Sequence, residues 1–169
     1  VVPAATSYQI YRSTAKDGDY QNIKTINSVG TSSWTDGSVK TGKTYYYKIK
    51  TVVKTQNGEQ TSGFSNVKSA KAVPAKTTLK AKASDAKNVK LTWSKVKGAS
   101  GYEIYRSNSK DGKCSKVKTI SKGSTTSYKN GKLKKSTTYY YKIRAYRKVN
   151  GKKVYGSYSS VVSVKTKAK

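Results

Sequence analysis

The 169-residue sequence predicts an all-β protein made of two copies of one antiparallel β-sandwich. The first observation is a stretch that occurs as residues 44–50 and again, 94 residues later, as residues 138–144. It combines tyrosine, threonine and isoleucine with interleaved cations, which favours a strand that is buried on one face and wet on the other. The second observation is that turn sequences such as Asp-Gly and Asn-Gly recur about every dozen residues. The third is the absence of any helical period.

The repeat extends well beyond this one stretch. At the same offset, three more segments of the first copy match segments of the second, namely residues 7–13 with 101–107, 16–18 with 110–112, and 23–26 with 117–120. Two domains are therefore expected, one over residues 1–74 and one over residues 75–169.

The second copy is expected to begin with two strands, at residues 78–83 and 88–94. The first of them alternates apolar residues with lysine or threonine. In the second, Val89 and Trp93 share one face while Lys90 lies on the other, because successive side chains of a strand point to opposite faces.

Five further short strands complete this copy. They are separated by turn residues, of which Asn150-Gly151 is a strong hairpin signal. They are expected at residues 102–107, 116–120, 125–130, 139–147 and 158–166. Seven short strands with frequent turns describe an antiparallel sandwich.

Several elements of the second copy together form a specific pattern: Trp93, the stretch 101–106, Leu133 and the stretch 138–145. This pattern resembles the fibronectin type III domain, and most of all the variety found in tandem in secreted and surface proteins of Gram-positive bacteria. The resemblance implies an immunoglobulin-like sandwich in which three strands face four. It also implies an extracellular location at the bacterial cell surface, where such modules commonly serve as spacers between other domains.

The resemblance further assigns a role to one tyrosine of each copy. Tyr45 and Tyr139 match the family's tyrosine-corner position, whose hydroxyl bonds back to the backbone of the corner. The usual corner proline is replaced by Thr41 and Lys135, which implies a less rigid corner.

The first copy lacks the equivalents of two strands. Residue 1 aligns with residue 95, so nothing corresponds to residues 75–94. Six side chains are therefore expected to be exposed: Tyr8, Ile10, Trp34, Tyr45, Tyr47 and Ile49. Either the missing strands lie upstream in a longer protein, or a strand-donating partner chain completes the first domain.

The composition is strongly basic. The chain has 36 lysines and arginines against seven acidic residues, a formal net charge of +29. Such a charge favours association with polyanions, whether nucleic acid, teichoic acid, acidic polysaccharide or an anionic membrane surface. No apolar run approaches the roughly 18 residues that a membrane span needs.

The sequence offers no candidate for catalysis, a metal site or a cofactor. Histidine is absent and Cys114 is the only cysteine, which removes the commonest general base and most metal ligands. Asp17, Asp19 and Asp111 occupy expected turns, where aspartate has a structural role. Glu103 is expected to point outward from its strand and to pair with a neighbouring lysine or arginine.

Strand alternation identifies a candidate binding surface on one sheet of each copy. The outward residues are expected to be Tyr105, Tyr140, Lys142, Arg144 and Tyr146 in the second copy, and Tyr11, Tyr46, Lys48 and Lys50 in the first. Aromatic rings interleaved with cations suit stacking on sugars or bases together with phosphate neutralisation. The favoured interpretation is that they are cross-strand pairs that stabilise the sheet, with lysine stems covering tyrosine rings.

The sequence therefore predicts a non-catalytic pair of spacer and surface-association modules in an exported bacterial protein, with electrostatic affinity for anionic cell-wall polymers. The first alternative is a carbohydrate-binding, adhesin-like module that uses the exposed tyrosines. The second is nucleic-acid binding.

Overall fold

The computed structural model describes residues 5–169, which divide into two compact units between Ala72 and Val73. Unit 1 ends at Ala72, two residues before the expected end of the first domain at residue 74. Residues 1–4 lie outside the described part. Every strand pair in the described chain is antiparallel, and residues 5–169 contain no helix. The chain is all-β, as predicted.

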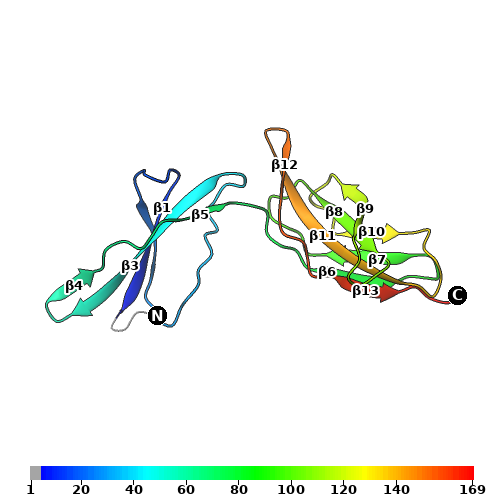
Figure 1. Cartoon of the computed structure of the whole chain (residues 1–169), viewed down its shortest axis with the longest axis horizontal. Coiled ribbons are helices and arrows are strands. Elements are labelled where there is room, and N and C mark those ends of the chain that lie inside the picture. The colour runs from blue at the N-terminus through cyan, green and yellow to red at the C-terminus, as the bar shows by residue number, and fades with distance from the viewer. Residues whose placement is uncertain (1–4) are drawn as a thin grey trace. The chain divides into compact units, whose positions relative to one another are not determined.

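Unit 2 is a two-layered sandwich (Figure 1). One layer is a three-stranded sheet of order β10-β7-β6, with β6 at Leu79–Ala83, β7 at Val89–Trp93 and β10 at Ser127–Asn130. In the other layer β11 is central, and its partners are β8, β12 and β13, with β9 beside β8. The bounds of this layer are β8 Gly101–Ser107, β9 Ser115–Ile120, β11 Thr138–Val149, β12 Lys152–Tyr155 and β13 Val162–Lys165.

The core of unit 2 lies between these layers and is formed by alternate residues of the facing strands. Trp93 of β7 packs on Tyr102 of β8 with ring centroids 5.4 Å apart. The fully buried side chains around them include Val89, Leu91, Ile104, Tyr141 and Ile143. The expected inward set of β7 is confirmed, because Val89, Leu91 and Trp93 all belong to this cluster.

The last strand of unit 2 differs from the expectation of one strand over residues 158–166. Only Val162–Lys165 of that range forms a strand, β13, and a separate short strand, β12, precedes it at Lys152–Tyr155; both pair with β11. Between them Ser159 maintains the connection to β11: its amide donates to the Ile143 carbonyl at 2.7 Å, and its Oγ accepts from the Ile143 amide at 3.1 Å. A serine hydroxyl therefore replaces a backbone carbonyl in the ladder, which the alternation of apolar residues does not reveal.

Both tyrosine corners have the expected hydrogen bond. The Tyr139 hydroxyl accepts from the Lys134 amide at 2.9 Å, and the Tyr45 hydroxyl accepts from the Lys40 amide at 3.0 Å. Both rings are almost fully buried. The corner thus forms with Lys135 in place of the usual proline.

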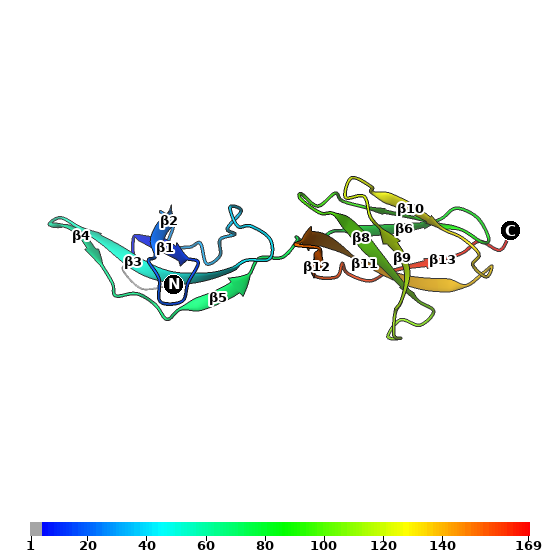
Figure 2. The same ribbon diagram turned by 90° about the horizontal axis from the view of Figure 1, so that it is seen from above.

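Unit 1 is a single sheet. β1 and β3 are its central strands, with β2 beside β1, and β4 and β5 beside β3 (Figure 2). The bounds are β1 Ser7–Ser13, β2 Gln21–Ile26, β3 Thr44–Thr55, β4 Gly58–Thr61 and β5 Lys68–Lys71. Within residues 5–72 nothing corresponds to the three-stranded sheet of unit 2, in agreement with the prediction of an incomplete first sandwich.

The exposure of the uncovered face is only partly as expected. Trp34 and Ile49 are exposed, by 38% and 42%, but Ile10 is only 8% exposed and Tyr45 only 6%. Tyr8 and Tyr47 are half-buried. The expectation of six exposed side chains was wrong for Ile10 and Tyr45, because other parts of unit 1 cover them.

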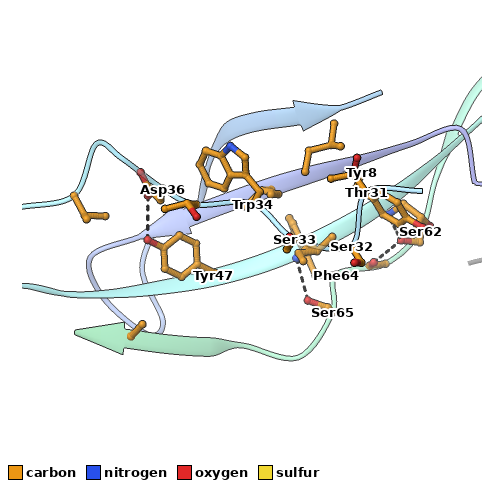
Figure 3. A pocket seen from close by; sticks show the side chains of 18 of the residues that line it. Tyr8, Thr31, Ser32, Ser33, Trp34, Asp36, Tyr47, Ser62, Phe64 and Ser65 are labelled. Atoms are coloured by element: carbon orange, nitrogen blue, oxygen red, sulfur yellow. Dashed lines mark hydrogen bonds between the residues drawn. The ribbon is translucent and has the colours of Figure 1, made fainter. Parts of the chain in front are cut away.

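Two features of unit 1 provide this cover. The guanidinium of Arg12 lies over the Tyr45 ring, 5.1 Å from its centroid. The strandless segment 31–36 runs along the sheet and lines the same groove as Ile10 (Figure 3).

Candidate functional site

The outer face of the five-stranded sheet of unit 2 is organised around one buried carboxylate, that of Glu103. Antiparallel pairing of β8 with β11 places it directly opposite Arg144. Its side chain is only 1% exposed although it points away from the core. Its two oxygens accept hydrogen bonds or ion pairs at 2.8–3.5 Å from Arg144, Tyr105, Lys153, Tyr155 and Lys116. The expected pairing of Glu103 with a neighbouring cation is confirmed, and it is far more extensive than expected.

These contacts determine the ionisation of Glu103. Burial by itself opposes a charged carboxylate, but the hydrogen bonds from Arg144, Tyr105 and Lys153 outweigh burial and lower the pKa of Glu103 to about 2. The carboxylate is therefore ionised at neutral pH, and it balances the cations gathered around it.

Aromatic rings surround the guanidinium of Arg144. It lies 3.7 Å from the ring centroid of Tyr155, 4.9 Å from that of Tyr158 and 5.4 Å from that of Tyr105. Tyr105 and Tyr158 meet edge to face, with centroids 5.2 Å apart. Such cation–π contacts are favourable and immobilise the arginine.

We refer to Glu103, Tyr105, Lys116, Arg144, Lys153, Tyr155 and Tyr158 as the Glu103 cluster. Five of its members were not among the predicted site residues, namely Glu103, Lys116, Lys153, Tyr155 and Tyr158. The Asn150-Gly151 hairpin could have indicated Lys153 and Tyr155, because it folds β12 back beside β11.

Tyr146 is not exposed as the alternation predicted. It is on the outer face but only 1% exposed. Pairing of β11 with β8 sets it opposite Gly101, and its hydroxyl donates to the Ile120 carbonyl at 3.3 Å, across the glycine. The missing side chain of Gly101 leaves the space that the tyrosine ring fills, a cross-strand arrangement in which an aromatic residue covers a glycine.

Of the five residues predicted on unit 2, Tyr140 and Lys142 are those outside the Glu103 cluster that retain exposure. Tyr140 is half-buried, and the amine of Lys142 lies 4.5 Å above the Tyr158 ring. Tyr105 and Arg144 bind to Glu103 instead. The contacts on this face are those expected of a self-stabilising sheet surface, whereas a ligand role for the predicted residues stays a prediction.

The outer face of unit 1 carries a neutral version of the same arrangement. Gln9 occupies the position of Glu103, and the Tyr11 hydroxyl donates to its Oε1 at 2.8 Å. Tyr11 meets Phe64 edge to face at 5.0 Å. Lys48 lies over the Tyr20 ring and Lys50 over the Phe64 ring, at 4.2 and 4.3 Å.

Tyr46, the remaining predicted residue of unit 1, is half-buried. The structure thus brings the four predicted residues of this unit onto one face, where the two lysine amines rest on aromatic rings.

The inner face of the unit 1 sheet contains an open groove of about 980 Å³ (Figure 3). Its lining is mainly apolar and includes Ile10, Trp34, Ile49 and Phe64. In unit 2 the equivalent face is covered by the three-stranded sheet. The groove is therefore the space in which a second layer of strands is missing.

A second buried polar group lies at the end of this groove. Asp36 accepts from the Arg12 guanidinium at 2.7 Å and from the Tyr47 hydroxyl at 3.0 Å. Partial burial opposes its charge, but hydrogen bonds from Ser38 and Arg12 hold the pKa of Asp36 at about 2. At the equivalent position of unit 2, the buried Asn130 accepts from the Tyr141 hydroxyl at 2.8 Å.

The positive charge is very unevenly distributed between the units. Residues 1–72 contain ten lysines and arginines and four acidic residues, a net charge of +6. Residues 73–169 contain 26 and three, a net charge of +23. A polyanion would therefore be attracted mainly by unit 2.

Residues 5–169 contain no group of three or more acidic or cysteine side chains that could hold a metal ion, and no helix long and apolar enough to cross a membrane. Cys114 is a half-buried free thiol.

Comparison with known proteins gives little further guidance. No protein-family model matches the chain, and no curated protein matches its sequence. Among solved structures, the chain is similar to the FN1–FN3 domains of chicken CNTN1, with 20% identity, a TM-score of 0.49, and coverage of 95% of this chain and 56% of that one. It is also similar to FN3tt, with 21% identity, a TM-score of 0.47, and coverage of 58% of this chain and 99% of that one. The chain thus spans little more than half of the first structure, and with both TM-scores below 0.5 the description of the fold rests on the strand pairing.

Proposed function

We propose that the chain is a non-catalytic pair of modules that associates electrostatically with anionic polymers of the bacterial cell wall. In this role it would act as a spacer and surface-association segment of an exported protein. The observation that carries the proposal is the net charge of +23 on unit 2, which far exceeds what solubility requires.

The character of the charged residues supports a polymer ligand over a small one. The cations of unit 2 are mostly exposed lysines dispersed over strands and loops, and lysine is a flexible, strongly hydrated point charge. Such a surface attracts an extended polyanion through many weak contacts, each of which salt screens.

The experiment is a retention assay on isolated Gram-positive cell walls. Retention should be nearly complete at roughly 50 mM NaCl and should fall steeply by about 500 mM, because counterions compete for the same charges. Walls from which phosphodiester-linked polymers have been extracted provide the matched control and should retain much less protein. Retention that ignores salt, or that survives the extraction unchanged, would overturn the proposal.

The same assay separates the glycan alternative. A carbohydrate site on the outer face of unit 2 would depend on Tyr140, which is half-buried and belongs to no internal cluster. Tyr140→Ala should leave salt-sensitive wall retention intact. If Tyr140→Ala abolishes retention, the contact is made by a glycan-binding aromatic surface and the electrostatic proposal fails.

We also propose that the open groove of unit 1 accepts a two-stranded segment with alternating apolar residues. The repeat supplies the evidence, since Val89, Leu91 and Trp93 of β7 cover the equivalent face in unit 2. A preceding part of a longer chain and a separate partner chain are both compatible sources.

A synthetic peptide covering residues 76–95, titrated into the protein, tests this groove. Binding should be accompanied by a blue shift of Trp34 fluorescence, because the exposed indole becomes buried. A matched peptide in which the residues at positions 91 and 93 are replaced by serine should not bind. Equal binding of both peptides, or of neither, contradicts the proposal.

A further inference from the structure

The three-stranded sheet of unit 2 carries a row of lysines on its outer face. Strand pairing sets Lys82 of β6 opposite Lys90 of β7, and Lys90 opposite Lys129 of β10. Paired strands lie about 4.8 Å apart. The three lysines therefore occupy neighbouring positions on a line that crosses the sheet perpendicular to its strands. We call these three residues the lysine row.

The fold forces these side chains outward. On β7 the flanking residues Val89 and Leu91 are completely buried in the core, so Lys90 between them must face solvent. On β10, Asn130 is buried and Lys129 beside it is exposed. All three members of the row are exposed.

Within the described part of the chain, no carboxylate forms an ion pair with the lysine row. No ion pair or hydrogen bond of the three amines is formed with residues 5–169. Asp85 interacts electrostatically with Lys129, but its carboxylate accepts from the Lys87 amide at 2.8 Å and from the Asn88 side chain at 2.8 and 2.9 Å.

The two outer faces of unit 2 are therefore electrostatically different. On the five-stranded sheet, Arg144, Lys116 and Lys153 share the buried carboxylate of Glu103. On the three-stranded sheet, like charges lie directly opposite one another, an arrangement that destabilises a sheet. An anion that bridges the lysines removes this repulsion. The free energy of binding therefore includes the loss of the repulsion between the lysines.

The side chains next to the lysine row indicate which kind of phosphate-bearing polymer it would bind. The outward residues beside the row are Thr92 and Ser127, which are paired with each other, and Lys80 on β6. No aromatic side chain projects from this face of the three strands, so a nucleic-acid base would find no ring on which to stack. A polyol phosphate offers regularly spaced phosphodiesters without bases and matches the row better.

We propose that the lysine row, flanked by Lys80, is the surface on which unit 2 binds a linear phosphodiester polymer of the cell-wall type, with the polymer running across β6, β7 and β10. This inference rests on the proposed function and assigns the polymer-binding surface to the three-stranded sheet of unit 2. It moves the binding surface away from the tyrosine-rich sheet and onto the opposite face of the sandwich.

The test compares two triple variants of the full chain that carry the same net charge. In the first, Lys82, Lys90 and Lys129 are replaced by glutamine. In the second, the same change is made at the exposed loop lysines Lys110, Lys113 and Lys122. Binding to immobilised poly(glycerol phosphate) is measured between roughly 50 and 500 mM NaCl.

The variant of the lysine row should lose about ten-fold or more in affinity at low salt, and the slope of log K against log salt should fall by about 2 to 3. The loop variant should lose much less of both. Equal losses in the two variants would overturn the location of the site while leaving wall binding intact. Failure of the unmodified chain to bind would instead overturn the proposed function.

Two further measurements keep the result interpretable. The triple Lys→Arg variant of the row preserves charge and should bind as the unmodified chain does, which excludes a folding artefact. The triple Lys→Gln variant should unfold at the same or a slightly higher temperature, because the repulsion within the row is removed. Tighter binding to a single-stranded oligonucleotide than to the polyol phosphate would overturn the choice of ligand.

Discussion

Replacing Glu103 by glutamine removes the one negative charge at the centre of the outer face of unit 2. Glutamine keeps the shape of the side chain but has a single acceptor oxygen, and its amide group donates hydrogen bonds. The cations of Arg144, Lys153 and Lys116 would then face one another without a carboxylate. Unit 1 tolerates Gln9 at the equivalent position because Lys50, with its amine on an aromatic ring, stands in place of Arg144.

The expected loss of stability is about 3 kcal/mol at neutral pH. The pKa of Glu103 is about 2, against an ordinary value of 4.5, and each unit of pKa corresponds to about 1.4 kcal/mol of differential interaction. Removing one partner from a buried charge pair ordinarily costs about 3–5 kcal/mol. The solvent exposure of the cation partners, 21–47% of their side chains, favours the lower end of this range.

The dependence of this loss on pH follows from the direction of the pKa shift. A carboxyl group whose pKa is lowered on folding contributes stability that is fully present above its unfolded value, near 4.5, and is lost as the pH falls toward its folded value, about 2. The difference between the unmodified protein and Glu103→Gln should therefore be constant above about pH 5 and should shrink markedly at pH 3.

Urea denaturation followed by tryptophan fluorescence measures the effect. A Trp34→Phe background leaves Trp93, which is 6% exposed in the core of unit 2, as the reporter of that unit. Asp111→Asn removes the same charge from an exposed turn of unit 2 and should leave its stability near that of the background protein. A loss below about 0.5 kcal/mol for Glu103→Gln, or a loss that is the same at pH 7 and pH 3, would refute the reasoning.

Three further substitutions test other contacts, each followed by the free energy of unfolding. Tyr139→Phe removes the corner hydroxyl and should cost about 1 kcal/mol, whereas Tyr140→Phe should be nearly neutral; equal effects would contradict the role of the corner bond. Gly101→Ala places a methyl group against the backbone of the neighbouring strand and against the Tyr146 ring, so it should destabilise unit 2 by at least about 1–3 kcal/mol, and a neutral result would show that the sheet relaxes around it. Ile143→Ala should cost about 2–5 kcal/mol because Ile143 is fully buried, while the equivalent Ile49→Ala in unit 1 should cost much less because Ile49 is 42% exposed; a similar cost at both positions would indicate that the unit 1 groove is closed in solution.

The sequence alone was sufficient for the all-β class, the two copies and most strand positions. These features are encoded locally: a period of two places Val89, Leu91 and Trp93 on one face of one strand, and the 94-residue offset relates the copies without any knowledge of contacts. The prediction that unit 1 lacks the strands that cover unit 2 follows from the same alignment.

The pairing of strands decided what the outer faces contain. Alternation places Tyr146 outward correctly, but only the register that sets it opposite Gly101 explains why it is buried. In the sequence, Glu103 is predicted to be a single acidic residue on the surface of its strand. In the structure it is buried, because β11, β12 and β9 bring cations from three distant segments into contact with its carboxylate.

The lysine row is also a feature that the sequence alone does not reveal. Lys82, Lys90 and Lys129 are unremarkable in a chain with 36 lysines and arginines, and Lys129 is 39 residues from Lys90 along the chain. Only the pairing of β6, β7 and β10 aligns them. An electrostatic field depends on distances in space, so the total charge of this protein was determined by its sequence, whereas the places where that charge is neutralised or left open were decided by its tertiary structure.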